Sequence, residues 1–219
     1  MLILASASPR RRELLTQAGF KFEIHPAHIP EDPYPNEDPI AYVTRLARQK
    51  AEAVFNEIAD TETDAGAPGL ASETWDGAIP GHKSLVVLGA DTTVTLDNQI
   101  LGKPDNAADA ARMLRLLSGR THRVITGVCL VSGSSSAGHA EGADTRAVST
   151  AAEVTAVQFL TLSESEIQAY IATGEPNDKA GAYAIQGHAA RWIPRIEGCY
   201  FNVVGLPIAL VSTLLDHLR

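Results

Sequence analysis

The stretch that most constrains this chain is Leu85 to Val94, with the sequence LVVLGADTTV. A short continuous apolar run that leads into a Gly-Ala step predicts a strand buried on both faces of a sheet. Asp91 follows the run directly, so the pattern predicts a carboxylate at the carboxyl end of a strand, where open α/β sheets place their ligand crevices. On this stretch alone, an acid that only caps a loop or faces water is an equally good interpretation.

A second candidate site lies at the N-terminus. Met1 to Ala5 predicts a short strand, and Ser8 followed by Pro9 predicts the start of a helix that ends at Gly19. Three consecutive arginines, Arg10 to Arg12, fall in the first turn, where positive charge opposes the helix dipole. An anion bound at the free N–H groups would offset this cost, and arginine suits phosphate. The pattern therefore favours a phosphate site over solvated surface arginines.

Further candidates are single charged residues in less specific contexts. Glu31 lies in a proline-rich loop over residues 26–39, where a metal ligand and a solvated acid are both open. Lys50 lies on a helix predicted from about Asp38 to Val54 and either points into a cleft or is exposed. Lys103 follows a predicted hairpin and either meets phosphate or is a loop lysine.

A Gly-punctuated stretch over residues 175–187 combines acids, a lysine, a tyrosine and a glutamine without helical or strand periodicity. Such a mixture is typical of a binding loop on a rigid scaffold, although a plain structural loop has the same composition. Gln186 carries both an amide donor and an acceptor, which would allow it to read the edge of a base.

The rest of the chain contains both predicted strands and predicted helices. We expect one domain over residues 1–219, with surface excursions at 60–82 and 132–144. The other predicted elements are a 96–101 hairpin return, helices at 107–117 and 163–173 and from 207 onward, strands at 121–131 and 145–160, and a hairpin of 191–196 with 199–204.

Charge and cysteine usage narrow the functional classes. The chain has 219 residues and a formal net charge of −8, which argues against general binding to nucleic acid or to an anionic membrane. Cys129 and Cys199 have no metal-type spacing and lie in apolar runs, which favours buried free thiols in a reducing compartment. With no apolar run long enough to span a membrane, we expect a cytoplasmic protein.

Six segments in order resemble the Maf family of nucleoside triphosphate pyrophosphatases from end to end, apart from the two excursions. They are LASASPRR (4–11), GADTTV (89–94), GKP (102–104), THRVITGV (121–128), DKAGAYAIQG (178–187) and NVVGLP (202–207). The resemblance implies an α/β fold with an ITPase-like mixed central sheet flanked by helices, and two lobes around a deep cleft. It also implies a homodimer, a divalent metal (Mg²⁺ or Mn²⁺), and cleavage of a nucleoside triphosphate to the monophosphate and pyrophosphate. DKAGAYAIQG resembles the dTTP/UTP-hydrolysing branch.

The resemblance also implies roles for individual residues. Asp91 matches the proposed proton acceptor, and Asp91 with Glu31 would hold the metal. The implied catalytic residues are Asp91, Lys103, Lys50 and Arg11, and those for substrate binding and specificity are Ser8, Arg10, Thr92, Asp178, Lys179 and Gln186.

Two rival functions stay open at this point. A sugar-nucleotide transferase also places arginines at a strand-to-helix turn and an acid beside them, but it needs an acceptor sugar. A non-catalytic nucleotide-binding regulator of septum formation would not need Asp91, Lys103 and the arginines together.

Overall fold

A seven-stranded mixed sheet forms the centre of the computed structural model, which describes residues 1–64, 84–134 and 146–218. The strand order is β2-β1-β3-β5-β6-β7, and β4 pairs with β3 outside this path. The strands are β1 (Leu2–Leu4), β2 (Glu23–Ile24), β3 (Ser84–Leu96), β4 (Gln99–Leu101), β5 (Thr121–Ser134), β6 (Ala147–Gln158) and β7 (Arg195–Glu197). The helices are α1 (Pro9–Gln17), α2 (Pro39–Asp64), α3 (Ala107–Leu117), α4 (Glu164–Ala172), α5 (Tyr200–Val204) and α6 (Ile208–Asp216), with short 3₁₀ helices η1 (Glu175–Asp178), η2 (Ala180–Ala182) and η3 (His188–Trp192).

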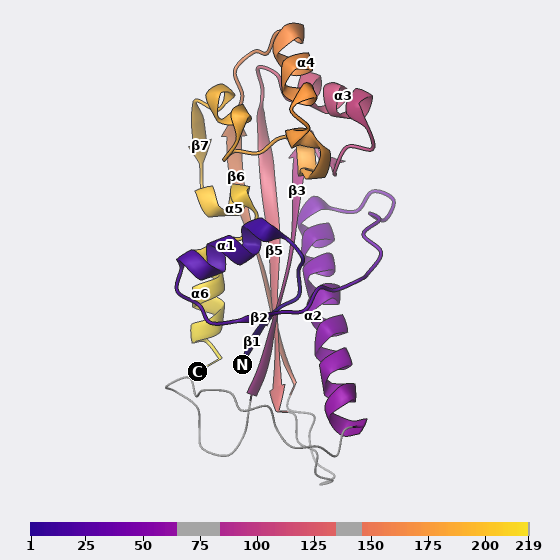
Figure 1. Ribbon diagram of the computed structural model, residues 1–219, viewed down its shortest axis with the longest axis vertical. Coiled ribbons are helices and arrows are strands. Elements are labelled where there is room, and N and C mark those ends of the chain that lie inside the picture. Colours follow the sequence, from indigo (N-terminus) through magenta and orange to yellow (C-terminus); the bar gives the residue numbers. More distant parts are fainter. Residues whose placement is uncertain (65–83, 135–145, 219) are drawn as a thin grey trace.

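The strands β3 and β5 run the length of the molecule and connect its two ends (Figure 1). They pair antiparallel from Ser84↔Ser134 to Thr95↔Arg123, and β6 continues the sheet antiparallel to β5. At the other edge of β3, β1 pairs parallel over Val86 to Leu88, and β4 pairs antiparallel from Val94 onward. Among the described residues, no strand pairs with this edge of β3 over Gly89–Thr93, a stretch named here the β3 gap.

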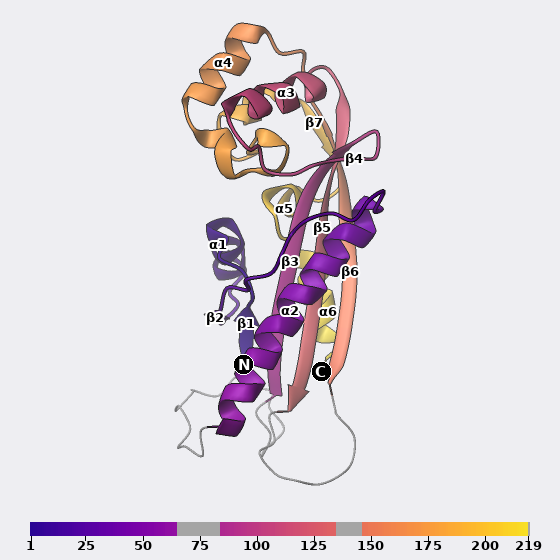
Figure 2. The same ribbon diagram turned by 90° about the vertical axis from the view of Figure 1, so that its right-hand side faces the viewer.

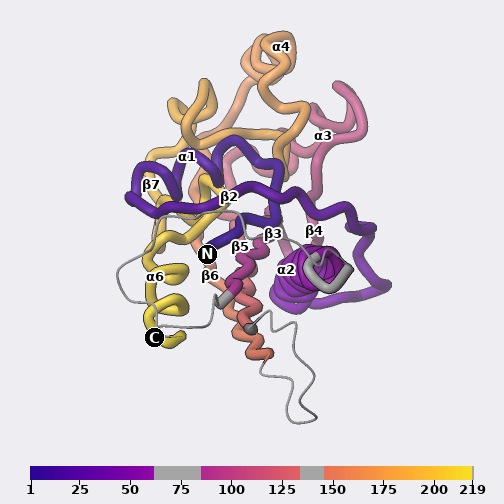
Figure 3. The backbone as a smooth tube through the Cα atoms, turned by 60° about the horizontal axis from the view of Figure 1, so that its bottom comes forward, coloured from indigo at the N-terminus to yellow at the C-terminus, as the bar shows by residue number. Residues whose placement is uncertain are grey.

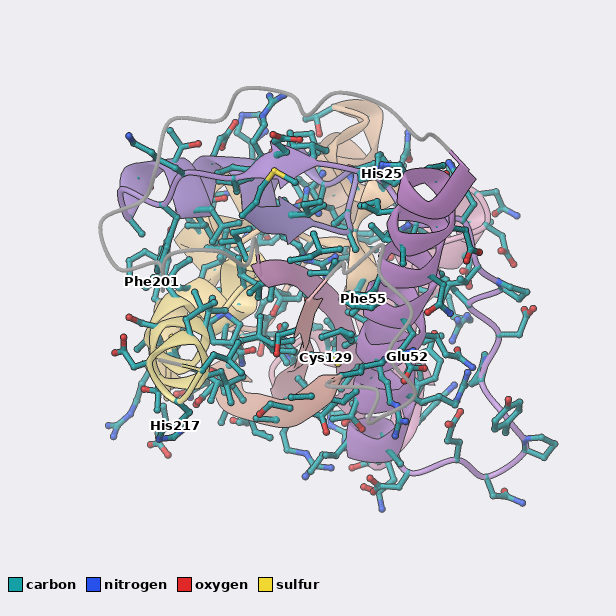
Figure 4. All side chains as sticks on the ribbon, turned by 90° about the horizontal axis from the view of Figure 1, so that it is seen from below. His25, Glu52, Phe55, Cys129, Phe201 and His217 are labelled. Atoms are coloured by element: carbon teal, nitrogen blue, oxygen red, sulfur yellow. The ribbon has the colours of Figure 1, made fainter. Side chains whose placement is uncertain are left out.

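The long helix α2 lies diagonally across one face of the sheet (Figure 2). It contacts β3 and β5 most, and its backbone comes very close to them at two glycines. A Cβ atom on Gly89 would lie 2.0 Å from the Ala47 carbonyl oxygen, and one on Gly127 would lie 2.3 Å from the Val43 carbonyl oxygen. Only glycine permits this approach of helix backbone to strand. Seen from below, Phe55 of α2 lies beside Cys129 of β5 in the layer between helix and sheet (Figure 4).

The opposite face of the sheet is covered by α1, α5 and α6, so that α2 and α6 lie on either side of the strands (Figure 3). The core on this side includes Leu15 of α1, Leu88 of β3, Leu130 of β5 and Val211 of α6, all of which are buried.

A second lobe forms around the far ends of β3 and β5 (Figure 1). Here α3, α4, the 3₁₀ helices and β7 enclose a separate core that includes Leu114, Phe159, Tyr170 and Trp192. The predicted fold class, a mixed central sheet flanked by helices, is confirmed. None of the helices within the described ranges has the length and hydropathy of a membrane-spanning segment.

The helix boundaries that depend on local capping are confirmed. The Ser8 side chain accepts from the N–H of Arg11 at the start of α1, with Pro9 at the first helical position. Ser163 and Glu166 form a reciprocal capping box at α4. In the β3–β4 hairpin, Asp97 and Asn98 both adopt positive φ, as the predicted two-residue turn requires.

Several predicted elements are wrong. Asp91 is not at the end of its strand, because the β-branched residues after it continue β3 as far as Leu96. The predicted hairpin of 191–196 with 199–204 does not form, because residues 191–192 belong to η3 and β7 pairs with β6 instead. The segment 199–204 contains α5, whose buried Asn202 donates to the Val124 carbonyl and to Thr155 Oγ1. Residues 60–64 belong to α2 and not to an excursion.

Residues 65–82 of the first predicted excursion lie outside the described residues. Residues 135–144 of the second predicted excursion also lie outside them, whereas residues 132–134 belong to β5. The single-domain prediction over 1–219 stays a prediction.

The close approach of α2 to the sheet leads to a stability prediction. We expect Gly127→Ala to lower the free energy of unfolding by about 2 kcal/mol or more, because the new Cβ overlaps the helix backbone and must push α2 away. Urea-induced unfolding of the two proteins measures the difference.

The matched control is Gly102→Ala, because a Cβ at Gly102 meets no atom within 4 Å. This variant should unfold within about 0.5 kcal/mol of the original protein. Equal stability of the two alanine variants would show that α2 does not depend on the missing Cβ at Gly127.

Candidate active site

The candidate site is a cavity of about 740 Å³ between the two lobes. This volume is within the range of small-molecule sites. The β3 gap supplies one wall, because β1 ends at Leu4 and β4 begins to pair only at Val94. The Asp91 side chain therefore lies just beyond the carboxyl end of β1, the parallel neighbour of its own strand. The sequence predicts that Asp91 lies at the carboxyl end of a strand. Asp91 does lie beyond the end of the neighbouring strand β1, but it lies inside its own strand β3.

All the residues predicted from the sequence to form the site line this one cavity. They are Ser8, Arg10 and Arg11 from the start of α1, Glu31 from the loop after β2, Lys50 from α2, Asp91 and Thr92 from β3, Lys103 after β4, and Asp178, Lys179 and Gln186 from the 3₁₀ region. The structure brings them together from segments far apart in the sequence; their individual roles stay predictions.

A cluster of three charges, of which Lys50 and Asp91 are buried, lies on the α2 side of the cavity. The Lys50 ammonium donates to Asp91 Oδ1 at 2.7 Å and contacts Glu31 Oε1 at 2.5 Å. Lys50 and Asp91 are 6% and 8% exposed, so their attraction is weakly screened by water. Burial acts to raise the pKa of Glu31, but the hydrogen bond and charge of Lys50, with the charges of Lys103 and Arg11, lower it below 4.5. Glu31 is therefore ionised at neutral pH.

Arg11 points to the other face of β3 and makes protein contacts. Its Nε donates to the Gly205 carbonyl at 2.9 Å, its Nη1 to Ser6 Oγ at 3.1 Å, and its Nη2 to Thr92 Oγ1 at 3.1 Å. Burial lowers the pKa of Arg11, whereas the charge of Asp91 acts in the opposite direction. In this structure Arg11 fixes Thr92 and the end of α5 relative to α1.

The remaining cationic side chains that line the cavity are Arg10, Lys103 and Lys179. Lys179 forms a hydrogen bond with Asp178, and Arg10 Nη1 lies 3.6 Å from Asp178 Oδ2. Burial acts to raise the pKa of Asp178, but these two cations lower it below its ordinary value. Lys103 is exposed and has no ion-pair partner within the described ranges. These three cations are the most accessible ones for an incoming anion.

The loop that carries Gln186 is braced by contacts that sequence reasoning missed. Glu175 Oε1 accepts from the Tyr170 hydroxyl at 2.6 Å, and Glu175 Oε2 accepts from the N–H of His188 at 3.1 Å. The Tyr170 hydroxyl in turn accepts from the N–H of Ala184 at 3.2 Å. The exposed Gln186 therefore lies on a loop held at both ends by one carboxylate and one phenol.

A second contact, between Tyr183 and His122, connects the cavity wall to strand β5 of the sheet. Tyr183 lines the cavity, and its hydroxyl shares a 2.7 Å hydrogen bond with Nε2 of the buried His122. Both rings pack edge-to-face against each other and against Phe159. The sequence contained no local signal for this contact, because 61 positions separate the partners.

Comparison with known proteins identifies the family of the chain. Residues 1–218 match the Maf-like protein family. The chain belongs to the Maf-like family. It is 47% identical over 98% of its length to a dTTP/UTP pyrophosphatase of Koribacter versatilis, of which the alignment covers 92%. Proteins with the same name from Moorella thermoacetica and Citrifermentans bemidjiense are 46% and 45% identical, with 98% and 100% of this chain covered and 93% and 94% of theirs.

Among solved structures, a nucleoside-triphosphatase / dITP/XTP pyrophosphatase from Mycobacterium abscessus matches at a TM-score of 0.35 and 16% identity. The match covers 71% of the Maf-like chain and 73% of the other.

The buried imidazole of this Maf-like protein leads to a pH prediction. Burial lowers the pKa of His122 from 6.5 to about 3, so the folded protein keeps this ring neutral where the unfolded chain protonates it. The stability contributed by the neutral ring is complete above pH 6.5 and is lost as the pH falls toward 3. Between pH 7 and pH 5 we expect His122 to account for a loss of about 2 kcal/mol in the free energy of unfolding.

Urea unfolding at both pH values, on the original protein and on His122→Gln, measures this contribution. Glutamine does not titrate, so the variant should lose less stability on acidification, whatever its stability at pH 7. An identical loss in the two proteins would contradict the prediction.

Proposed function

We propose that this Maf-like protein is a nucleoside triphosphate pyrophosphatase that hydrolyses dTTP and UTP to the monophosphate and pyrophosphate. The observation that carries the proposal is the cavity itself, which joins the Lys50–Asp91–Glu31 cluster to the loop of Gln186. One end offers acids and cations for a triphosphate, and the other offers an amide for a base. The relatives named dTTP/UTP pyrophosphatase, which match nearly the whole chain, support the same activity.

The charge balance of the cavity supports a role for a divalent cation. Five cationic and five acidic side chains line it: Arg10, Arg11, Lys50, Lys103 and Lys179, and Glu31, Asp32, Asp91, Asp105 and Asp178. Because the lining is close to neutral, it cannot by itself balance the roughly four negative charges of a nucleoside triphosphate. A bound Mg²⁺ or Mn²⁺ would supply the missing charge and polarise the phosphate oxygens.

Asp91 and Glu31 are the two carboxylates that fit such a cation, since both reach the same ammonium of Lys50. The described residues contain no group of three or more His, Cys, Asp or Glu side chains suited to a metal. This agrees with Mg²⁺ sites in which one or two carboxylates act together with substrate phosphates.

The proposed chemistry assigns tasks to the chain's own side chains. Lys103, Arg10 and Lys179 hold the phosphates, and Lys50 fixes Asp91. Asp91 Oδ2 has no hydrogen-bond partner among the described residues, so it can accept a proton from the attacking water or contribute to cation binding. The water attacks the α-phosphorus, and pyrophosphate leaves. Most of the acceleration comes from positioning and electrostatics.

A homodimer in the cytoplasm completes the proposal. The free thiols of Cys129 and Cys199 suit a reducing compartment. The dimer is inferred from the family resemblance, and light scattering of the purified protein tests it.

The proposal predicts pyrophosphate release from UTP and dTTP in preference to CTP, GTP and ATP, with Mg²⁺ or Mn²⁺ present. Pyrophosphate and monophosphate should appear in equal amounts without any acceptor molecule. Turnover only with an added sugar phosphate would favour a transferase, and nucleotide binding without turnover would favour a regulator.

The base preference should depend on Gln186. Its amide can donate to O4 and accept from N3–H of uracil or thymine, whereas the edge of cytosine has the reverse pattern. The side chain of Gln186 is exposed, so its replacement should leave the fold intact, and an ionised carboxylate at this position cannot donate to O4. We therefore expect Gln186→Glu to lower the ratio of kcat/KM for UTP over CTP by about tenfold or more.

The exposed Gln99, which is not among the cavity-lining residues, offers a matched control. Gln99→Glu makes the same chemical change outside the cavity and should keep the original ratio. An unchanged UTP-to-CTP ratio in Gln186→Glu would show that the proposed base contact is wrong.

A further inference from the structure

The loop that brings Glu31 into the cavity is attached to α2 by a set of contacts outside the charged cluster. This loop, residues 25–38, connects β2 to α2 and is named here the Glu31 loop. We propose that Arg45 is a positioning residue that holds the Glu31 loop against α2, so that the Glu31 carboxylate meets Lys50 and Asp91. The inference rests on the proposed function, because it concerns the same site.

Arg45 makes its strongest contacts with the Glu31 loop. Its Nε lies 2.6 Å from Glu37 Oε1, and its Nη2 lies 2.6 Å from Glu37 Oε2, which is a bidentate pair. Its Nη2 also donates to the Asp32 carbonyl at 3.2 Å, and its guanidinium lies 4.0 Å from the centre of the Tyr34 ring. Glu37, Asp32 and Tyr34 all belong to the loop, so one side chain of the helix holds it at three points.

The ion pair between Arg45 and Glu37 is largely shielded from solvent, although it lies near the surface. The side chains of Arg45 and Glu37 are 19% and 9% exposed. The hydrogen bond from Arg45 lowers the pKa of Glu37, so the pair stays ionised through the neutral range. A shielded, bidentate and stacked arginine is a much more effective tether than an exposed ion pair.

A second contact fixes the backbone of Glu31 itself. The Tyr42 hydroxyl donates to the Glu31 carbonyl at 2.8 Å. Burial, with the charges of Asp91 and Glu31, raises the pKa of Tyr42 to about 12, so the phenol remains a donor. Tyr42 and Arg45 are three positions apart on α2 and therefore lie on one side of the helix.

These contacts explain how an irregular loop can hold the Glu31 carboxylate in a defined position. The loop has no helix or strand of its own and contains Pro26, Pro30, Pro33 and Pro35. The Glu31 side chain is 45% exposed, so its ordered position cannot come from burial alone. Because Tyr42, Arg45 and Lys50 share one rigid helix, the loop is attached to the element that also carries the partner of its carboxylate.

The test is a double-mutant cycle of Arg45→Met with Glu31→Gln, followed by pyrophosphate release from UTP. If Arg45 acts through Glu31, Arg45→Met should lower kcat by about tenfold or more in the original protein. In the Glu31→Gln background, the same substitution should cause little further loss, because residues that act as a unit are non-additive. KM should change much less than kcat.

Arg48→Met is the matched control, because Arg48 lies on the same helix and pairs with Glu52 rather than with the Glu31 loop. It should retain the original kcat. Glu37→Gln keeps the loop sequence nearly intact and should reproduce the Arg45→Met effect in weaker form, which keeps the test available if Arg45→Met does not fold.

An equal fold-reduction by Arg45→Met, or by Glu37→Gln, in both backgrounds would overturn the inference and indicate a general structural role. Full activity of Glu31→Gln would overturn it as well. Absence of pyrophosphate release from the original protein would be a different result, because it would refute the proposed function itself.

Discussion

The buried contact between Lys50 and Asp91 is the interaction on which the rest of the site depends. Removing two opposite charges from water costs several kcal/mol per ion, and only close geometry compensates for this. Lys50 is on α2 and Asp91 is on β3, so the contact depends on how the helix packs against the strand. The glycines at 89 and 127 allow the helix to pack closely, and Gly127 is the residue directly opposite Asp91 in the β3–β5 ladder. The packing of the core thus determines the geometry of the charged cluster.

The close packing of α2 on β3 also helps to explain why the cavity forms beside Asp91. The alternation of side chains along β3 directs Asp91 toward α2 and Thr92 toward Arg11 on the opposite face. Both line the cavity, at the edge of the strand that the β3 gap leaves without a neighbour in the described part of the sheet. The Glu31 loop then closes the α2 side, and the loop braced by Glu175 closes the side of the second lobe. Two irregular loops are thereby held in place by regular elements.

Features encoded locally were predictable from the sequence, and features that depend on distant contacts were not. The caps at Ser8 and Ser163 use side chains within three residues of the groups that they satisfy, so the sequence predicts them directly. The sequence could not show that residues 199–204 form a helix, because Asn202 takes its partners from β5 and β6. The residues that line the cavity were predicted as a set through motifs in fixed order, whereas the contacts of Arg45, Glu175 and His122 are visible only in the structure. The position of Asp91 depends on where β1 ends, which no pattern within β3 records.

The most direct test of the central claim is the steady-state kinetics of Asp91→Asn, measured as pyrophosphate release from UTP beside urea unfolding of the same protein. Asparagine keeps the shape of the side chain but has no negative charge, so it can neither accept the proton nor attract a cation. The account predicts a protein that still unfolds cooperatively, at a lower urea concentration because Lys50 loses one of its two carboxylate partners, and a kcat lower by at least about 100-fold. A folded Asp91→Asn protein with near-normal kcat would contradict it.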